Sequence, residues 1–235
     1  MSAPQFDQAR RQIADTCREL ARRGLVLGTA GNVSVRVARP GSAEADAFGT
    51  SDAFAITPTG GDFATMEAHH VVLVDADGHV LAGDLQPTSE LGLHLGLYRS
   101  SDTGAIVHTH APMATAVSCV LDELPCIHYQ MLALGGAIPV ATYATFGTQE
   151  LVRSVLGAME GRPAVLMANH GALTHGQNLE IAVAHTLLLE WACEMYWRAA
   201  SIGKPRALDT EQQMAVIRQV LVRNYGTTQP IAEAD

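Results

Sequence analysis

The sequence predicts a mixed α/β domain in which helices cover a sheet that contains antiparallel hairpins. Three observations lead to this prediction. Short segments alternate apolar and polar residues and end in glycine-rich turns, which is the pattern of strands. Two long stretches with helical periodicity, 179–200 and 210–223, close the chain. No repeat or linker divides residues 1–235, so we expect a single domain.

The first part of the chain begins with a helix and continues in short strands. Phe6, Ile13, Cys17 and Leu20 recur at helical spacing, and Gly24 is well placed to end that helix. A polar turn is then expected at 28–32, followed by a strand at 33–37 and an exposed loop at 39–53. A second strand is expected at 54–57 and another turn at 58–61.

A hairpin and further alternation of strands and helices follow. Asp77-Gly78 lies between the apolar segments 71–75 and 79–82, which is a strong hairpin signal. A helix is expected from Pro87 to about Arg99. The remaining expected elements are a strand at 105–110, a helix opened by Pro112 and a buried strand at 164–168.

Composition excludes several classes of function. The net charge of −9 argues against a general affinity for nucleic acid, which depends on clustered lysine and arginine. No apolar run is long enough to cross a membrane, and the charged start does not have the form of a signal peptide. The cysteines have no framework spacing and most lie in apolar stretches, so we expect a reduced, soluble, cytoplasmic protein.

Three histidines have the placement of metal ligands. His108 and His110 are two residues apart in an expected strand, so both side chains leave the same face. His170 ends a second apolar strand in a tight Asn-His-Gly turn. An isolated pair of this kind is more typical of partly buried histidines, but three neutral nitrogens with an open position describe a catalytic zinc site. The sequence therefore predicts a metal centre.

Glu90 is the natural carboxylate partner of this centre. It falls in the first turn of the expected helix, where Thr88 and Ser89 add hydroxyls beside free backbone N–H groups that suit an anion. Taken alone, these residues favour an ordinary capped helix. His94 lies one turn beyond Glu90, and we expect it to support the site from behind. The other histidines are expected to be structural or at the surface: His69, His70, His79, His128, His175 and His185.

Two further turns have the character of phosphate loops. Gly31-Asn32 and Thr59-Gly60 each place a glycine, which lets backbone N–H groups approach an anion, beside a hydrogen-bonding side chain. Each turn alone is a weak signal, because most such turns bind nothing.

Taken together, the motifs resemble the class II aldolase/adducin family, in family order and over nearly the whole chain. The matching segments are GNVSVR (31–36), ITPTG (56–60), QPTSE (86–90), IVHTHAP (106–112), IHY (127–129), YATFGTQEL (143–151), NHG (169–171) and RNYG (223–226).

The resemblance implies both a fold and a set of roles. The implied fold is a three-layer α/β/α arrangement whose central sheet is mixed, mostly antiparallel and of about nine strands. It implies a cyclic homotetramer with the active site at the subunit interface. Zinc would be held by His108, His110 and His170 together with Glu90, which also serves as acid and base. The positions that match the substrate phosphate site are Gly31, Asn32, Thr59, Gly60, Thr88 and Ser89, and those that match active-site tyrosines are Tyr129 and Tyr225.

The expected activity is reversible cleavage of a ketose 1-phosphate to dihydroxyacetone phosphate and an aldehyde such as lactaldehyde. Such a reaction needs a lysine Schiff base or a Lewis-acid metal to spread the carbanion charge. The only lysine, Lys204, lies in a Ser-Ile-Gly-Lys-Pro turn, which is a poor setting for a desolvated amine. The sequence therefore favours the metal.

The sequence is compatible with alternatives. Related pentulose-phosphate 4-epimerases carry aspartate at the position of Glu90, which favours the aldolase, whereas a decarboxylase of a phosphorylated oxo-acid would use the same sites. A non-catalytic, adducin-like association domain would be expected to lack the metal ligands. Manganese, cobalt or iron would suit the donors as well as zinc does. The loop 39–53, longer than the family pattern, either borders the pocket or extends into solvent.

Overall fold

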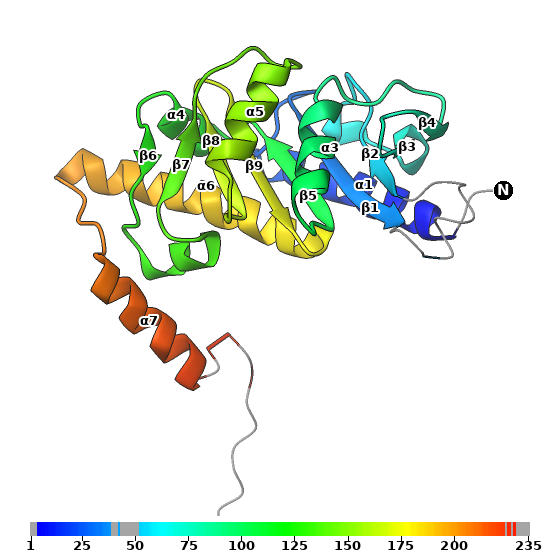
Figure 1. The fold of residues 1–235 in the computed structure, drawn as a ribbon. Helices are drawn as coiled ribbons and strands as arrows, with labels where there is room; N and C mark the ends of the chain where they lie inside the picture. The colour runs from blue at the N-terminus through cyan, green and yellow to red at the C-terminus, as the bar shows by residue number, and fades with distance from the viewer. Residues whose placement is uncertain (1–3, 39–41, 43–51, 224, 227, 229–235) are drawn as a thin grey trace, which may run out of the picture.

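A nine-stranded sheet forms the centre of the computed structural model, which describes residues 4–38, 42, 52–223, 225, 226 and 228 (Figure 1). In chain order the strands are β1 (Gly31–Ala38), β2 (Ala53–Ile56), β3 (Val72–Asp75), β4 (Val80–Ala82), β5 (Ala105–Thr109), β6 (Glu123–Leu124), β7 (Ile138–Ala141), β8 (Ala164–Met167) and β9 (Gly171–Gly176). Their order across the sheet is β4-β3-β2-β1-β5-β9-β8-β7-β6. Among these described strands, β7 and β8 run parallel and every other neighbouring pair is antiparallel.

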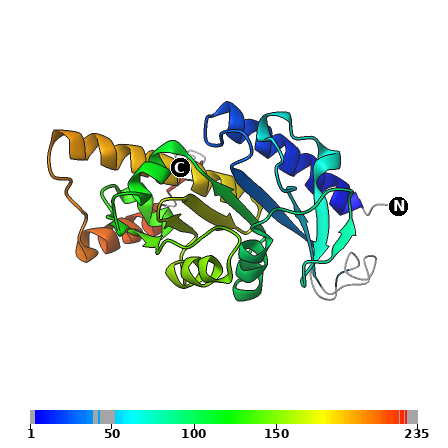
Figure 2. The ribbon, with the colours of Figure 1, turned by 90° about the horizontal axis from the view of Figure 1, so that it is seen from above.

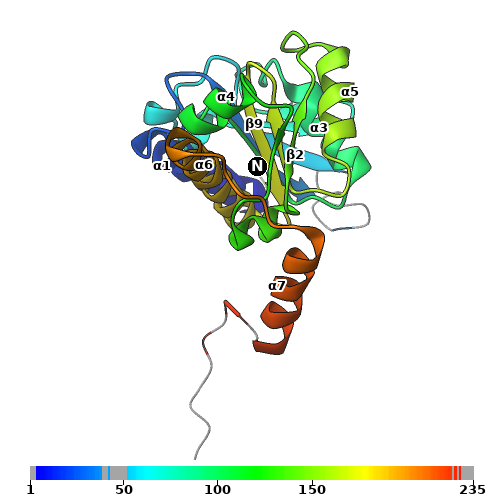
Figure 3. The same ribbon diagram turned by 90° about the vertical axis from the view of Figure 1, so that its left-hand side faces the viewer.

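Helices cover both faces of this sheet. They are α1 (Pro4–Arg22), α3 (Leu91–Ser100), α4 (Pro112–Ser118), α5 (Gln149–Ala158), α6 (Leu179–Ile202) and α7 (Thr210–Arg223), with 3-10 turns η1 (Phe63–Thr65), η2 (Ala68–His70) and η3 (Tyr129–Leu134). One face carries α1, α4 and α6 and the other α3 and α5 (Figure 2 and Figure 3). This is the three-layer α/β/α arrangement predicted from the resemblance.

Two hydrophobic cores, one on each face, explain why strands such as β2 and β8 are wholly apolar. In β2, Ala53 and Ala55 pack toward α1 and α6, whereas Phe54 and Ile56 pack toward α3 and α5. Alternation in β5 places Val107 in the first core and Ile106 in the second, so that His108 emerges on the side of α3.

Several predicted elements are confirmed, with shifted ends. The predicted hairpin at Asp77-Gly78 is present as β3 and β4, and the two closing helices are α6 and α7. The helix expected from Pro87 begins only at Leu91, because the first two residues pair with another segment: Pro87 forms an isolated antiparallel bridge with Pro58, and the Thr88 N–H donates to the carbonyl of Thr57. Residues 39–53 fall almost entirely outside the described residues.

Other elements were missed. The strands β6, β7 and β9 and the helix α5 had no separate prediction. In β9, glycines at both ends and a histidine interrupt the apolar pattern on which the prediction depended. Cys17, Cys126 and Cys193 are buried as expected, but Cys119 is exposed.

The last helix differs from the others. Figure 1 shows α7 leading away from the layered body, and none of its residues is buried in the single chain. Apolar side chains such as Leu221 and Val222 are more than 70% exposed. None of the helices in the described part of the chain combines the length and apolar character needed to cross a membrane.

Candidate metal centre and anion pocket

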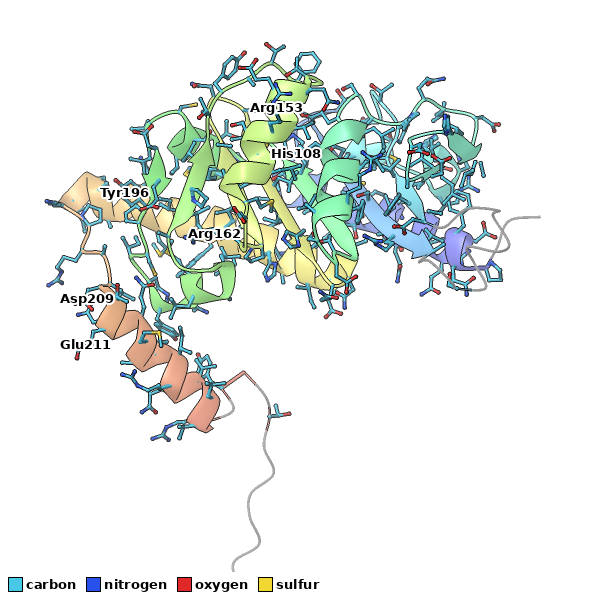
Figure 4. All side chains as sticks on the ribbon, viewed as in Figure 1. His108, Arg153, Arg162, Tyr196, Asp209 and Glu211 are labelled. Atoms are coloured by element: carbon cyan, nitrogen blue, oxygen red, sulfur yellow. The ribbon has the colours of Figure 1, made fainter. Side chains whose placement is uncertain are left out.

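Three histidines meet at one end of the central strands. His108 comes from β5, His110 follows directly after it, and His170 lies in the turn between β8 and β9. Their potential ligand nitrogens all lie within 4.8 Å of one another, and the Nε2 atoms of His108 and His110 are 3.1 Å apart. Figure 4 shows the labelled His108 inside the body, between α3 and α5 in that view.

Backbone features that tolerate few substitutions bring these histidines together. Asn169, just before His170, has φ of 54° and is the only non-glycine residue with positive φ among the described residues. Asparagine tolerates this left-handed conformation better than most residues. A Cβ atom at Gly171 would lie 2.4 Å from the carbonyl oxygen of Thr109, so only glycine lets β9 approach the end of β5 this closely. The Asn-His-Gly turn thus aims His170 at the other two rings.

Glu90 completes the cluster from the N-terminal end of α3, where it is the N-cap residue. Its Oε2 lies 3.2 Å from His108 Nε2 and its Oε1 lies 3.5 Å from His170 Nε2. The Asn32 side chain donates a hydrogen bond of 2.9 Å to Oε2. Burial raises the pKa of Glu90, but His108 and Asn32 more than offset this, so the net pKa lies well below its usual range. The carboxylate is therefore ionised at neutral pH.

The donor set fits a divalent metal ion. Burial and the neighbouring His108 lower the pKa of both His110 and His170 to about 4, so their rings are neutral and carry a free lone pair at neutral pH. His108 Nδ1 donates to the carbonyl of Ala172, which leaves Nε2 facing the cluster. Nitrogens bound to a tetrahedral zinc ion lie roughly 3.3 Å apart, close to the observed spacing of the His108 and His110 nitrogens.

A cavity of about 290 Å³ opens beside the cluster. All six residues predicted for phosphate binding line it, together with Glu90, His110 and His170. None of the lining residues, all within the described part of the chain, is lysine or arginine. An anion here would be held by hydroxyl and backbone N–H groups rather than by a cationic side chain.

The site prediction missed some residues of this cavity. Tyr143 and Phe146, both more than half exposed, form part of its wall, and so do Thr29 and Asn169. The signal was present in the sequence, because three of these four residues lie in the segments YATFGTQEL and NHG. In the sequence, these two segments support the family resemblance but do not indicate that Tyr143, Phe146 and Asn169 line the site.

The two predicted tyrosines lie elsewhere in the single chain. The hydroxyls of Tyr129 and Tyr225 are 3.3 Å apart, and both rings line a separate groove along α7. In Figure 4, Asp209 and Glu211 mark the start of α7 outside the body that contains His108. One chain therefore does not bring these tyrosines to the histidine cavity, and their catalytic role stays a prediction.

Comparison with known proteins, taken with the layered sheet and the histidine centre at its end, identifies an enzyme of the class II aldehyde-lyase type. The chain belongs to the family described as "Class II Aldolase and Adducin N-terminal domain", whose sequence pattern matches residues 11–197.

Individual relatives agree with this assignment. The chain is 38% identical to "L-fuculose phosphate aldolase" of Escherichia coli over 218 residues, which cover 92% of this chain and 94% of the relative. It is 36% identical to "5-methylthioribulose-1-phosphate/5-deoxyribulose-1-phosphate aldolase" of Rhodospirillum rubrum over 219 residues, 92% of each chain. A solved structure of "L-fuculose 1-phosphate aldolase" superposes with a TM-score of 0.81 at 33% identity, covering 94% of this chain and 98% of that one.

Proposed function

We propose that this protein is a zinc-dependent aldolase that reversibly cleaves a ketose 1-phosphate to dihydroxyacetone phosphate and an aldehyde such as lactaldehyde. The observation that carries the proposal is the position of Glu90, held between His108 and His170 at the wall of a cavity that also contains the predicted phosphate turns. Relatives whose names give three different sugar phosphates as aldolase substrates support this class of substrate.

The metal would be held by His108, His110 and His170, with Glu90 as the oxygen donor. A divalent cation bound there would act as a Lewis acid and draw negative charge away from the carbon next to the substrate carbonyl. We favour zinc because imidazole nitrogens with a carboxylate are typical of catalytic zinc sites, although manganese, cobalt and iron accept similar donors.

Glu90 is the proton carrier in this proposal. In the direction of synthesis it takes a proton from the dihydroxyacetone-phosphate carbon that will form the new bond, and in the direction of cleavage it returns that proton. Its pKa, well below the usual range, keeps the carboxylate unprotonated at neutral pH, as a proton acceptor must be, although it also makes the carboxylate a weak base. The wall lined by Gly31, Asn32, Thr59, Gly60, Thr88 and Ser89 is the part that we assign to the phosphate.

Tyr129, aided by Tyr225, would handle the proton on the oxygen that becomes the aldehyde, or hydrogen-bond to that oxygen. Since one chain keeps this pair away from its own cavity, we propose that a neighbouring copy supplies it, in a cyclic homotetramer with the active site at the subunit interface. The exposed apolar residues of α7, which include Leu221 and Val222, are suited to such an interface. A reducing compartment such as the cytoplasm suits the four unpaired cysteines.

The decisive experiment is an aldol addition assay with dihydroxyacetone phosphate and a panel of aldehydes, with and without a chelator. We expect carbon–carbon bond formation with at least one small aldehyde, loss of activity with the chelator and recovery when zinc is restored. Release of carbon dioxide from a phosphorylated oxo-acid, without aldol activity, would favour a decarboxylase instead. A chain that contains no metal as isolated from cells would favour an association domain.

A further inference from the structure

A continuous chain of hydrogen bonds runs from Glu90 into the core on the α3 side of the sheet. Asn32 Nδ2 is 2.9 Å from Glu90 Oε2, and Asn32 Oδ1 is hydrogen-bonded to His94 Nε2. His94 Nδ1 is 2.7 Å from Ser34 Oγ, which in turn is 2.8 Å from the hydroxyl of Tyr98. These four side chains behind Glu90 are almost completely buried, and no exposed side chain interrupts the path.

The direction of every bond in this chain follows from its first member. An ionised carboxylate only accepts, so the Asn32 amide must donate to Glu90 through its nitrogen and present its oxygen to His94. His94 therefore carries its proton on Nε2, and its Nδ1 accepts the Ser34 hydroxyl. Ser34 Oγ then accepts the hydroxyl proton of Tyr98. Burial lowers the pKa of His94 to about 3, which agrees with a neutral ring that has one donor and one acceptor.

The secondary structure places the four side chains of this hydrogen-bond chain in two pairs, one on α3 and one on β1. His94 and Tyr98 are four residues apart in α3 and so lie on one side of that helix. Asn32 and Ser34 are two residues apart in β1 and point to the same face of the sheet. The far end is anchored because the Tyr98 ring stacks on Phe54 with centroids 4.2 Å apart.

We propose that Tyr98, Ser34, His94 and Asn32 form a positioning chain that fixes the orientation of the Glu90 carboxylate. The inference rests on the proposed function in one respect, namely that Glu90 carries the proton. It also gives Asn32 a role besides the one assigned to the phosphate wall: the residue is 3% exposed, one N–H of its amide donates to Glu90 and its oxygen accepts from His94, while the second amide N–H is not used in this chain of hydrogen bonds.

A second imidazole–hydroxyl pair, away from Glu90, provides a control. His175 Nδ1 is 2.8 Å from the Thr103 hydroxyl, which reproduces the bond between His94 and Ser34. The other nitrogen of His175 faces the carbonyl of Arg162, on a path that does not lead to Glu90. His94 is completely buried whereas His175 is half-buried, so the comparison is made on kcat of the folded, metal-loaded protein and not on stability.

The kinetic test compares His94→Phe with His175→Phe in the metal-loaded protein, using an aldehyde that the unmodified protein accepts. We expect His94→Phe to lower kcat by roughly 10- to 100-fold, with KM for dihydroxyacetone phosphate changed by less than about twofold. His94→Gln keeps a nitrogen donor and should recover most of the loss, and His175→Phe should stay near the unmodified protein. A raised KM with unchanged kcat in Asn32→Ala, or equal losses in both histidine variants, would overturn the proposal.

A spectroscopic test does not depend on activity or on the variants folding. Nitrogen-15 NMR of the histidine rings in the unmodified chain should find His94 neutral with its proton on Nε2. A neutral ring with the proton on Nδ1, or a ring charged at neutral pH, would overturn the proposed chain. If the unmodified protein has no aldol activity, the proposed function fails, whereas the protonation of His94 still decides the direction of these hydrogen bonds.

Discussion

The two groups of predicted catalytic residues contrast sharply in their surroundings. Glu90 and His108 are almost wholly buried, and each is held by several partners from different elements. Tyr129 and Tyr225 are 40% and 63% exposed, and their hydroxyls share one long hydrogen bond of 3.3 Å at the surface. One chain thus brings together by itself the residues proposed for metal binding and proton transfer, whereas it leaves the two tyrosines proposed to act on the substrate away from them.

Loss of a histidine ligand is the largest expected effect. In His110→Ala, one of three neutral nitrogens is missing, so bound zinc and aldol activity should both fall, activity by on the order of 10³-fold or more because the metal contributes several kcal/mol. Metal analysis and the aldol assay on the same sample measure both. His69→Ala, at an exposed histidine, is the control and should match the unmodified protein. Full activity in His110→Ala would remove the histidine cluster from the proposed mechanism.

Substitution of Glu90 should give the next largest effect. Glu90→Gln keeps the shape of the side chain but removes its ability to take a proton, so we expect a fall in kcat of about 10²- to 10⁴-fold. Exchange of the dihydroxyacetone-phosphate proton with heavy water, followed by NMR, isolates this step from bond formation. If Glu90→Gln keeps full cleavage activity with zinc bound, Glu90 is not the base. The buried residues around Glu90 and His108 would then serve only to bind the metal.

The two regions also differ in how far the sequence predicts them. The metal ligands and the phosphate turns depend on local features, namely strand ends and turns that require glycine, and such features are visible in a short segment. His170 is an example, because the Asn-His-Gly turn identifies its conformation directly. The resemblance then joined the segments into a site, and the cavity contains the six predicted phosphate positions.

The positioning chain behind Glu90 needed the three-dimensional structure. Alternation of Val33, Val35 and Val37 identifies a strand but not the helix that covers its other face, where Ser34 is completely buried. Contact between Ser34 and Tyr98 depends on how α3 packs on β1, and these residues are 64 positions apart in the sequence. The structure connects His94 to Glu90 through Asn32, so the support expected from His94 would be indirect.

Acidification should weaken metal binding gradually. Burial opposes protonation of His108, but Glu90 raises its pKa above the ordinary value, so His108 takes a proton first as the pH falls. His110 and His170 follow near their pKa of about 4. Zinc affinity of the metal-free protein should therefore be highest at neutral pH or above and fall by about tenfold per pH unit once one ligand is protonated. Titration with zinc between pH 8 and pH 5 measures this slope, and a flat profile would contradict histidine ligation.

The smallest expected effect concerns the exposed tyrosines. Tyr225→Phe removes one surface hydroxyl, so the stability of the single chain should change by less than about 0.5 kcal/mol. If the hydroxyl acts on the substrate through one hydrogen bond, activity should fall by about tenfold. Thermal melting and the aldol assay separate the two effects, and the bound zinc should not change.

Mixed oligomers decide where that hydroxyl acts. In a tetramer assembled from His110→Ala chains and Tyr225→Phe chains, a site that takes its metal ligands from one copy and its tyrosine from another contains an intact set of both. Co-expressed mixtures should therefore be several times more active per intact metal site than Tyr225→Phe alone. If the tyrosine acts on the cavity of its own chain, no mixed site is intact and the activity stays at the level of Tyr225→Phe. That result would mean that α7 folds back over its own body, and the open arrangement of the single chain would not be the active one.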